Sequence, residues 1–208
     1  MNKKFIIILL ILIVITISGS LGAARQLTGD ELDFKESEAG QIIEARRNVE
    51  LLYDELRITA EDLGIYHRYS GEIEFRYNVE LFYQDYQGRA YELQGNIEEE
   101  VFYLEEDAVL EAEASYLEAD RIKIYQAEER IEGHGNAYLE YENFWAEADQ
   151  IISYLDREIT HLSGNVRGER NGERFSADTA EINQAENEVR LRGQAKLSLP
   201  EEEASDDN

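Results

Sequence analysis

The chain of 208 residues contains no cysteine and only one proline. The lack of cysteine excludes disulfides and metal sites that use thiolate ligands. The proline, Pro200, begins a C-terminal segment, residues 200–208, that is rich in Glu and Asp and poor in apolar side chains. Because such a segment has too little apolar surface to bury, we predict an acidic disordered tail.

Positive charge is also scarce. The chain has 20 Lys and Arg residues against 46 Asp and Glu residues, which gives a net charge of −26 at pH 7. A chain of this charge repels phosphate backbones, so nucleic acid is excluded as a partner. Because the acids are spread along the whole chain, a solvated acidic surface is favoured over a platform that collects divalent cations.

Charged residues are absent between Phe5 and Ala24. Two preceding lysines, a strongly apolar run and small residues at its end are typical of a secretory signal peptide cleaved after Ala24. The alternative is a membrane anchor, because about 20 apolar residues span a bilayer. We therefore predict from residues 1–24 that the chain is exported. An uncleaved form, with Lys3 and Lys4 inside, would keep its N-terminus in the cytoplasm.

Hydrophobic residues in the rest of the chain recur at every second position. In "GEIEFRYNVELFYQ" the apolar and aromatic positions are Ile73, Phe75, Tyr77, Val79, Leu81 and Tyr83. Strict alternation is typical of a strand with one buried face. The stretch 105–114 also contains good helix formers. We nevertheless predict strands and turns throughout, with a hairpin turn at Asn171-Gly172.

A 29-residue repeat organises the second half of the chain. An Ala-Asp pair recurs in "LEADRIKIY", "AEADQIISY" and "FSADTAEIN", and a glycine follows each pair at a fixed distance. Such repeats indicate one supersecondary unit stacked on copies of itself, here two strands per unit. Weaker echoes occur at 47–53, 77–83 and 95–103. The repeated positions are Asp120, Asp149 and Asp178, followed by Gly135, Gly164 and Gly193.

The hydrophobic positions change parity at each aspartate. Leu117 and Ala119 are odd-numbered, whereas Ile122 and Ile124 are even-numbered. A β-bulge or a sharp strand bend produces a one-residue slip of this kind. We expect the aspartate to accept a hydrogen bond from an amide that the bend leaves unpaired. We expect the glycines to mark close approach rather than breaks in the strands.

The repeated aspartates do not predict catalysis. Catalytic carboxylates converge on one site, whereas residues repeated in register on stacked strands form a ladder with steps of about 4.8 Å. The histidines His67, His134 and His161 share no sequence context, and no nucleophile elbow, phosphate loop or HExxH motif occurs. We predict no enzymatic activity, no metal site and no cofactor. Calcium on the Asp ladder is the alternative, although the glycine-rich nonapeptide spacing of such sites is absent.

The inward face of the predicted strands mixes large and small side chains. For any single residue, the simplest interpretation is a packed core. Two layers that do not fill the space between them would instead leave an apolar groove for acyl chains. The predicted groove residues are Phe75, Tyr77, Leu81, Leu93, Leu117, Ala119, Ile131, Leu139, Phe175 and Leu191.

Two repeat units, "EADRIKIYQAEERIEGHGNAYL" and "AEADQIISYLDREITHLSGNV", resemble the OstA/LptA family of periplasmic lipopolysaccharide-transport proteins. The similarity covers residues 40–199 and is clearest over 114–199. It implies an all-β fold, an antiparallel β-jellyroll that forms a slightly open sandwich and carries the acyl chains of lipid A inside. If residues 1–24 are retained, the resemblance shifts to LptC, which has the same fold on an anchor.

The resemblance further implies a periplasmic, non-enzymatic carrier of lipopolysaccharide or a related lipid, anchored in the inner membrane if residues 1–24 remain. Its partners would be other β-jellyroll transport components that stack edge to edge, and the same edges allow a homo-oligomer. We expect a linker or first edge strand at 25–39 and the jellyroll domain at 40–199.

The strong negative charge departs from the family. Anionic head groups would be repelled unless they stay outside the groove or are bridged by divalent ions. A structural β-repeat protein of the cell envelope that binds polysaccharide is the alternative function.

Overall fold

The computed structural model describes residues 25–37, 40–112 and 114–199. The signal peptide or anchor predicted for 1–24 and the tail predicted for 200–208 lie outside these residues. Strands cover nearly all of the described chain, with one 3-10 turn at Leu155–Arg157. Within this part of the chain, no helix has the length and apolar character needed to cross a membrane.

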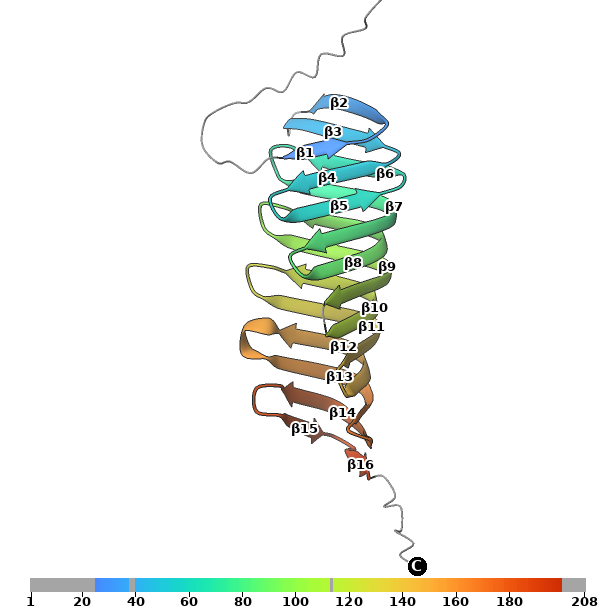
Figure 1. The fold of residues 1–208 in the computed structure, drawn as a ribbon, viewed down its shortest axis with the longest axis vertical. Coiled ribbons are helices and arrows are strands. Elements are labelled where there is room, and N and C mark those ends of the chain that lie inside the picture. Colours follow the sequence, from blue (N-terminus) through green and yellow to red (C-terminus); the bar gives the residue numbers. More distant parts are fainter. Residues whose placement is uncertain (1–24, 38–39, 113, 200–208) are drawn as a thin grey trace, which may run out of the picture.

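The strands form one 16-stranded sheet in which all pairs are antiparallel. Figure 1 shows them stacked like rungs, with β2 at one end of the molecule and β16 at the other. The strands are β1 Gln26–Thr28, β2 Glu31–Ser37, β3 Gly40–Arg46, β4 Val49–Tyr53, β5 Leu56–Ala60, β6 Leu63–His67, β7 Glu72–Tyr83, β8 Tyr86–Asn96, β9 Val101–Ala112, β10 Ser115–Tyr125, β11 Arg130–Tyr141, β12 Phe144–Tyr154, β13 Ile159–Arg170, β14 Glu173–Asn183, β15 Glu188–Arg192 and β16 Lys196–Ser198.

The sheet is folded lengthwise into two layers. In β7, residues 73–76 pair with β6, whereas residues 80–83 pair with β5. Each strand from β8 to β14 likewise bends in its middle and contributes one half to each layer. We call the layer with β2, β3, β6 and β15 the first layer, and the layer with β1, β4, β5 and β16 the second layer. The fold is the predicted antiparallel β-jellyroll, and its two layers are halves of one sheet that does not close.

The parity change in the sequence marks these bends in β8, β10, β12 and β14, whereas β7, β9, β11 and β13 keep their parity and bend at two left-handed residues. In β10, Leu117 and Ala119 are buried before the bend, and Ile122 is buried after it. The pairing with β9 shifts between Ala119 and Arg121, where the single residue Asp120 opposes two residues of β9, Glu106 and Asp107. The stretch 105–114, with its good helix formers, lies largely in β9, where Leu104, Ala108 and Leu110 are buried at even-numbered positions on both sides of the bend. Here the burial pattern has overridden helix propensity.

A repeated Asp–Gly–Asn contact holds the bends together. In β11, Gly135 and Asn136 have left-handed φ angles of 75° and 46°. The side-chain amide of Asn136 donates to the two carboxylate oxygens of Asp120, at 3.2 and 3.1 Å. Two further units repeat this geometry, with Asp149, Gly164 and Asn165, and with Asp178, Gly193 and Gln194.

The expectation that the glycines would not break the strands is confirmed for Gly135 and Gly164, which lie within the continuous strands β11 and β13, whereas Gly193 follows the end of β15. Gly135 lies inside the register shift between His134 and Ala137, and Gly164 lies inside the shift between Ser163 and Val166. A positive φ is what turns the chain from one layer into the other at these positions. The expected close approach at the glycines is confirmed, because each glycine lies directly against the aspartate of its unit.

The 29-residue repeat extends into the N-terminal half, where its sequence signal is weak. Consecutive left-handed residues occur at Arg47-Asn48, Tyr77-Asn78 and Glu106-Asp107, in line with Gly135-Asn136. The echoes at 47–53 and 77–83 therefore begin at true bends. The echo at 95–103 does not, because Asn96 ends β8 at a turn. A further Asp–Asn contact, Asn48 to Asp30 at 3.2 Å, begins the series.

Candidate functional site: a lateral groove

The two layers are joined along the bends and separate along the opposite side, where the turns lie. First-layer turns have four residues, at 68–71, 97–100, 126–129, 155–158 and 184–187. Main-chain hydrogen bonds connect successive turns. The N–H of Gln126 donates to the carbonyl of Glu100 at 3.0 Å, and the N–H of Leu155 to that of Glu129 at 2.8 Å. These turns form a continuous wall.

Second-layer turns have two residues, at 54–55, 84–85, 142–143 and 171–172. They face the first-layer turns across an opening that we call the mouth, since both rows line the same cavities. Among the described second-layer turns, a main-chain bond joins only Asn171 to Asn143, at 3.2 Å. The second-layer side of the mouth is therefore the less continuous wall.

Three cavities of about 460, 400 and 440 Å³ lie along the mouth. These volumes are in the range of small-molecule sites. Neighbouring cavities share lining residues, so they form one lateral groove that runs from Tyr53 of β4 to Ile182 of β14. The shared residues are Tyr86, Leu110, Ile131 and Leu155 for the first two cavities, and Leu56, Tyr83, Phe102 and Gln126 for the last two.

The predicted groove residues divide between the groove and the core. Leu117, Ile131 and Leu139 line the 460 Å³ cavity, and Leu81 and Ile131 line the 400 Å³ cavity. The remaining inward residues pack in the core between the layers and line none of the three cavities. They are Phe75, Leu93, Ala119 and Phe175, which are buried, and Leu191, which is partly buried.

Tyr77 does not point between the layers, so its predicted inward position is wrong. Its side chain is 47 % exposed and makes an edge contact with Tyr91, with ring centroids 5.6 Å apart. The physical reason is its left-handed φ of 72°, which places it in the bend of β7. Tyr77 occupies the position that Gly135 holds two repeats later.

The aromatic residues that flank the turns were not among the predicted groove residues. Tyr83 and Tyr86 enclose the turn at 84–85, and Tyr141 and Phe144 enclose the turn at 142–143. All four aromatic side chains line the groove. A signal is present in the sequence, because the aromatic pairs on both sides of a two-residue turn recur two repeats apart.

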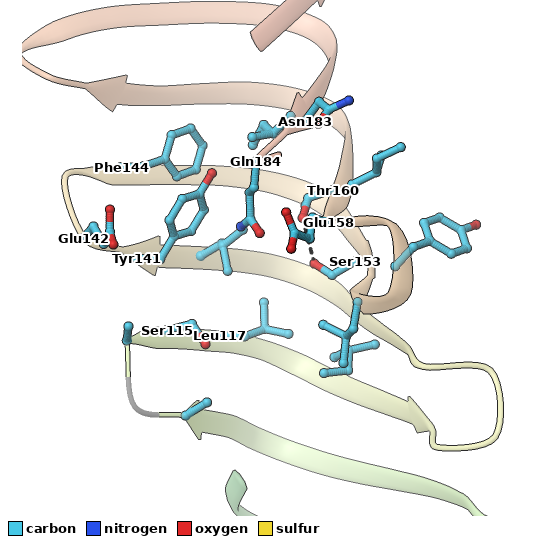
Figure 2. A pocket seen from close by; sticks show the side chains of 18 of the residues that line it. Ser115, Leu117, Tyr141, Glu142, Phe144, Ser153, Glu158, Thr160, Asn183 and Gln184 are labelled. Atoms are coloured by element: carbon cyan, nitrogen blue, oxygen red, sulfur yellow. Dashed lines mark hydrogen bonds between the residues drawn. The ribbon is translucent and has the colours of Figure 1, made fainter. Parts of the chain in front are cut away.

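The 460 Å³ cavity also carries uncharged polar groups. Ser153 and Thr160 are joined by a hydrogen bond of 3.1 Å, and Thr160 is only 3 % exposed. Figure 2 shows this pair on one side of the cavity, with Tyr141 and Gln184 extending toward each other. Burial raises the pKa of Tyr141, although its hydrogen bond with Gln184 acts in the opposite direction. A ligand here would meet apolar surface and neutral hydrogen-bonding groups together.

Arginines cross the mouth near both ends of the described chain. Arg25 donates to the hydroxyls of Tyr66 at 3.1 Å and Tyr53 at 2.8 Å, and pairs with Glu98 at 2.7 Å. Burial opposes the charge on Arg25, but the two tyrosine hydrogen bonds outweigh it and raise its pKa. At the other end, Arg170 of the second layer donates to the Asn187 carbonyl of the first layer at 3.2 Å.

The repeated aspartates lie at the bends, on the opposite side of the sandwich from the mouth. Each one is bonded to the Asn or Gln of its unit, and no carboxylate pair converges there. Within the described ranges, no group of three or more His, Asp and Glu side chains is placed to hold a metal ion. The geometry of these aspartates is that of a structural ladder.

No family model matches the chain, and no curated protein matches it in sequence. Among solved structures, the chain is similar to the crystal structure of LptH from Pseudomonas aeruginosa. That protein is described as the LptA-homologous periplasmic component of a lipopolysaccharide transport device. The TM-score is 0.54 at 14 % sequence identity, covering 57 % of this chain and 96 % of that one. This likeness shows an Lpt-like β-jellyroll fold.

Proposed function

We propose that the protein is a non-enzymatic lipid carrier of the periplasm, which holds acyl chains in the lateral groove and serves as a bridge toward the outer membrane. The observation that carries the proposal is the groove itself. It is continuous across three cavities, apolar on its floor at Leu81, Leu117 and Ile131, and open along its length. An acyl chain needs such a channel, because its burial is favourable by about 0.8 kcal/mol per CH₂.

Lipopolysaccharide is the proposed cargo. The sequence resemblance to the OstA/LptA family and the Lpt-like fold both support this choice. A periplasmic location agrees with the predicted export signal, and retention of residues 1–24 would make the protein an LptC-like anchored component of the same system. The groove chemistry favours acyl chains, and the head group of a bound lipid would lie at the mouth.

The two ends of the sheet are the proposed docking edges for other β-jellyroll components or for a second copy of the chain. The outer strands β1 and β2 run from the second layer to the first, and β15 and β16 run from the first to the second. A copy placed end to end would therefore continue the antiparallel pairing. The two edges differ in charge. Asp33 and Glu36 lie on β2 at one end of the sheet, whereas Arg192 on β15 and Lys196 on β16 lie at the opposite end.

A structural, polysaccharide-binding role is the second candidate. It is favoured by a row of aromatic side chains on the outer face of the second layer, away from the groove. Tyr116 and Tyr138 have centroids 6.1 Å apart, and Tyr138 and Trp145 have centroids 6.4 Å apart. Glu118 and Glu140 accept hydrogen bonds from the two tyrosine hydroxyls, which raises both tyrosine pKa values to about 12.

Native mass spectrometry of the full chain, purified from membranes in mild detergent, separates the two candidates. The carrier proposal predicts a protein that retains acylated lipid, released by organic solvent. A lipid-free protein that binds polysaccharide or forms fibres would overturn it in favour of the structural role.

A further inference from the structure

The two rows of turns that border the mouth, which we call the rim, are both acidic. Every first-layer turn from 97–100 to 184–187 carries at least one carboxylate, and so do the second-layer turns at 54–55, 84–85 and 142–143. A head group attached to chains in the groove must pass between these two rows. It therefore meets negative charge on both sides, in a space with less screening water than bulk solvent.

Three of these acidic residues have a backbone conformation that is unfavourable for glutamate. Glu100, Glu129 and Glu158 end successive first-layer turns with φ angles of 57°, 47° and 54°. The flanking turns have Gly71 and Asn187 at the same position. Gly and Asn are the residues that the left-handed region favours, whereas Glu adopts it at a cost. Turn geometry alone therefore does not account for the glutamates along the middle of the groove.

The positive charges at the groove are fewer than the rim carboxylates, and within the part of the chain that the structure describes only Arg170 is not paired with an acid. Of the described residues, Arg130 and Arg170 are the cations that line the three cavities. Arg130 pairs with Glu128 at 2.9 Å and also with Glu132, and Arg170 donates to the Asn187 carbonyl. Across the mouth, burial together with the charges of Asp85 and Glu129 raises the pKa of Tyr86. Glu129 thus acts on the second-layer wall as well as on its own.

The groove does offer hydrogen bonds to a neutral head group. Ser153, Thr160 and Gln184 line the 460 Å³ cavity and point into it from the first layer (Figure 2). Hydroxyl and amide groups both donate and accept, so they match sugar or glycerol hydroxyls. A phosphate at the same place would meet the carboxylates of Glu142 and Glu158 and a single cation, Arg170, whose donors are already bonded to Asn187.

We propose that the rim selects by charge, so that the groove takes acyl lipids whose head group is uncharged and rich in hydroxyls, and rejects anionic ones. This inference rests on the proposed carrier function and narrows its substrate class. An anionic lipid, lipopolysaccharide included, binds only when divalent cations neutralise its head group.

The test is lipid binding by the full chain at low ionic strength, measured with two probes of identical acyl chains. The neutral probe is dioleoyl glucosylglycerol, and the anionic probe is dioleoyl phosphatidylglycerol. The rim predicts about tenfold weaker binding of the anionic probe, as expected for a charge facing several carboxylates about 10 Å away. Mg²⁺ or high salt closes this gap. Lipopolysaccharide is expected to bind in the presence of Mg²⁺ and not in the presence of a chelator.

The variant Glu129→Gln/Glu158→Gln removes two rim charges and tightens binding of phosphatidylglycerol several-fold, with the neutral probe unchanged. The matched control is Glu106→Gln/Asp107→Asn, which removes two charges from left-handed residues at the bends, on the far side of the sandwich. It leaves the ratio of the two affinities unchanged.

Three results overturn the inference, and they differ in what else they affect. If neither probe binds, the proposed carrier function fails as well. If both probes bind equally, or lipopolysaccharide binds in chelator, the carrier function stands and charge selection fails. If the bend variant changes the ratio as much as the rim variant, net charge rather than the rim is responsible.

Discussion

Gly135 lies so close to Asp120 that a Cβ atom on the glycine would overlap Oδ2 of the carboxylate and approach its Cγ at 2.9 Å. The glycine is also left-handed, with φ of 75°. Backbone conformation therefore favours glycine at this position, and the contact with Asp120 excludes a larger residue. The same pair of constraints recurs at Gly164 against Asp149 and at Gly193 against Asp178. The Ala-Asp motif of the repeat is thus one half of a contact between neighbouring strands.

Replacing Gly135 with alanine should destabilise the fold by about 2–4 kcal/mol, since a left-handed alanine costs about 1–2 kcal/mol and the Asp120 hydrogen bonds are lost in addition. The control is Gly172→Ala in the turn between β13 and β14. Gly172 has φ of 84° with nothing within 4 Å of its would-be Cβ, so only the backbone cost of about 1–2 kcal/mol applies. Urea denaturation measures both. Equal losses would show that the Asp contact contributes nothing.

Phe75 and Tyr77 are both odd-numbered positions of β7, but they have opposite environments. Phe75 is 0 % exposed and Tyr77 is 47 % exposed. Phe75→Ala should therefore cost about 3–5 kcal/mol through loss of buried area and creation of a cavity. Tyr77→Ala should cost less than about 1.5 kcal/mol, the energy of one aromatic pair. Thermal or chemical unfolding of the two variants checks this, and similar losses would contradict the bend at Tyr77-Asn78.

Ile131 lines two of the three cavities, so a larger side chain there should block the groove. Ile131→Trp fills the space where the 460 and 400 Å³ cavities meet, and should abolish lipid retention while reducing stability by only about 1–3 kcal/mol. His161→Trp is the control, because its side chain is 47 % exposed. Lipid content is measured by solvent extraction and mass spectrometry. Undiminished lipid in the Ile131 variant would place the acyl chains elsewhere.

Stability should fall at high pH through Tyr141. Burial raises its pKa in the folded protein, whereas the unfolded chain has the usual tyrosine value of about 10. The unfolded state therefore loses the proton first, so the contribution is fully present below pH about 10 and is lost as the pH rises through the folded value. Tyr141→Phe should flatten the decline of the unfolding free energy above pH about 10. An unchanged slope would contradict a buried, protonated Tyr141.

The alternating pattern and the 29-residue repeat were sufficient to predict stacked units of two strands, and the resemblance to the OstA/LptA family supplied the antiparallel β-jellyroll. The parity change at Asp120 also predicted the bend, because burial on one face imposes its period on the sequence. Tyr77 was misplaced for a definable reason. It lies two repeats before Gly135, but without a glycine the left-handed conformation left no local signal, and strict alternation was carried through the bend.

The groove was less predictable than the strands. Alternation indicates that the side chains of Leu93 and Leu117 point inward, but it does not indicate whether the opposite layer contacts them. Leu93 is closed in the core, whereas Leu117 borders a cavity. That difference depends on distance from the bend, where the layers converge, and on the turns that set the width of the mouth. The strained glutamates of the first-layer wall were likewise visible only once φ was known.

The most direct test of the carrier function compares two adjacent residues of β10. Leu117 is 6 % exposed and lines the 460 Å³ cavity, whereas Glu118 lies on the outer face and accepts a hydrogen bond from Tyr116. A photo-crosslinking amino acid is placed at each position in turn, and the protein is irradiated in living cells. The carrier function predicts a crosslinked lipid from position 117 and none from position 118. Crosslinks from position 118 alone would contradict it.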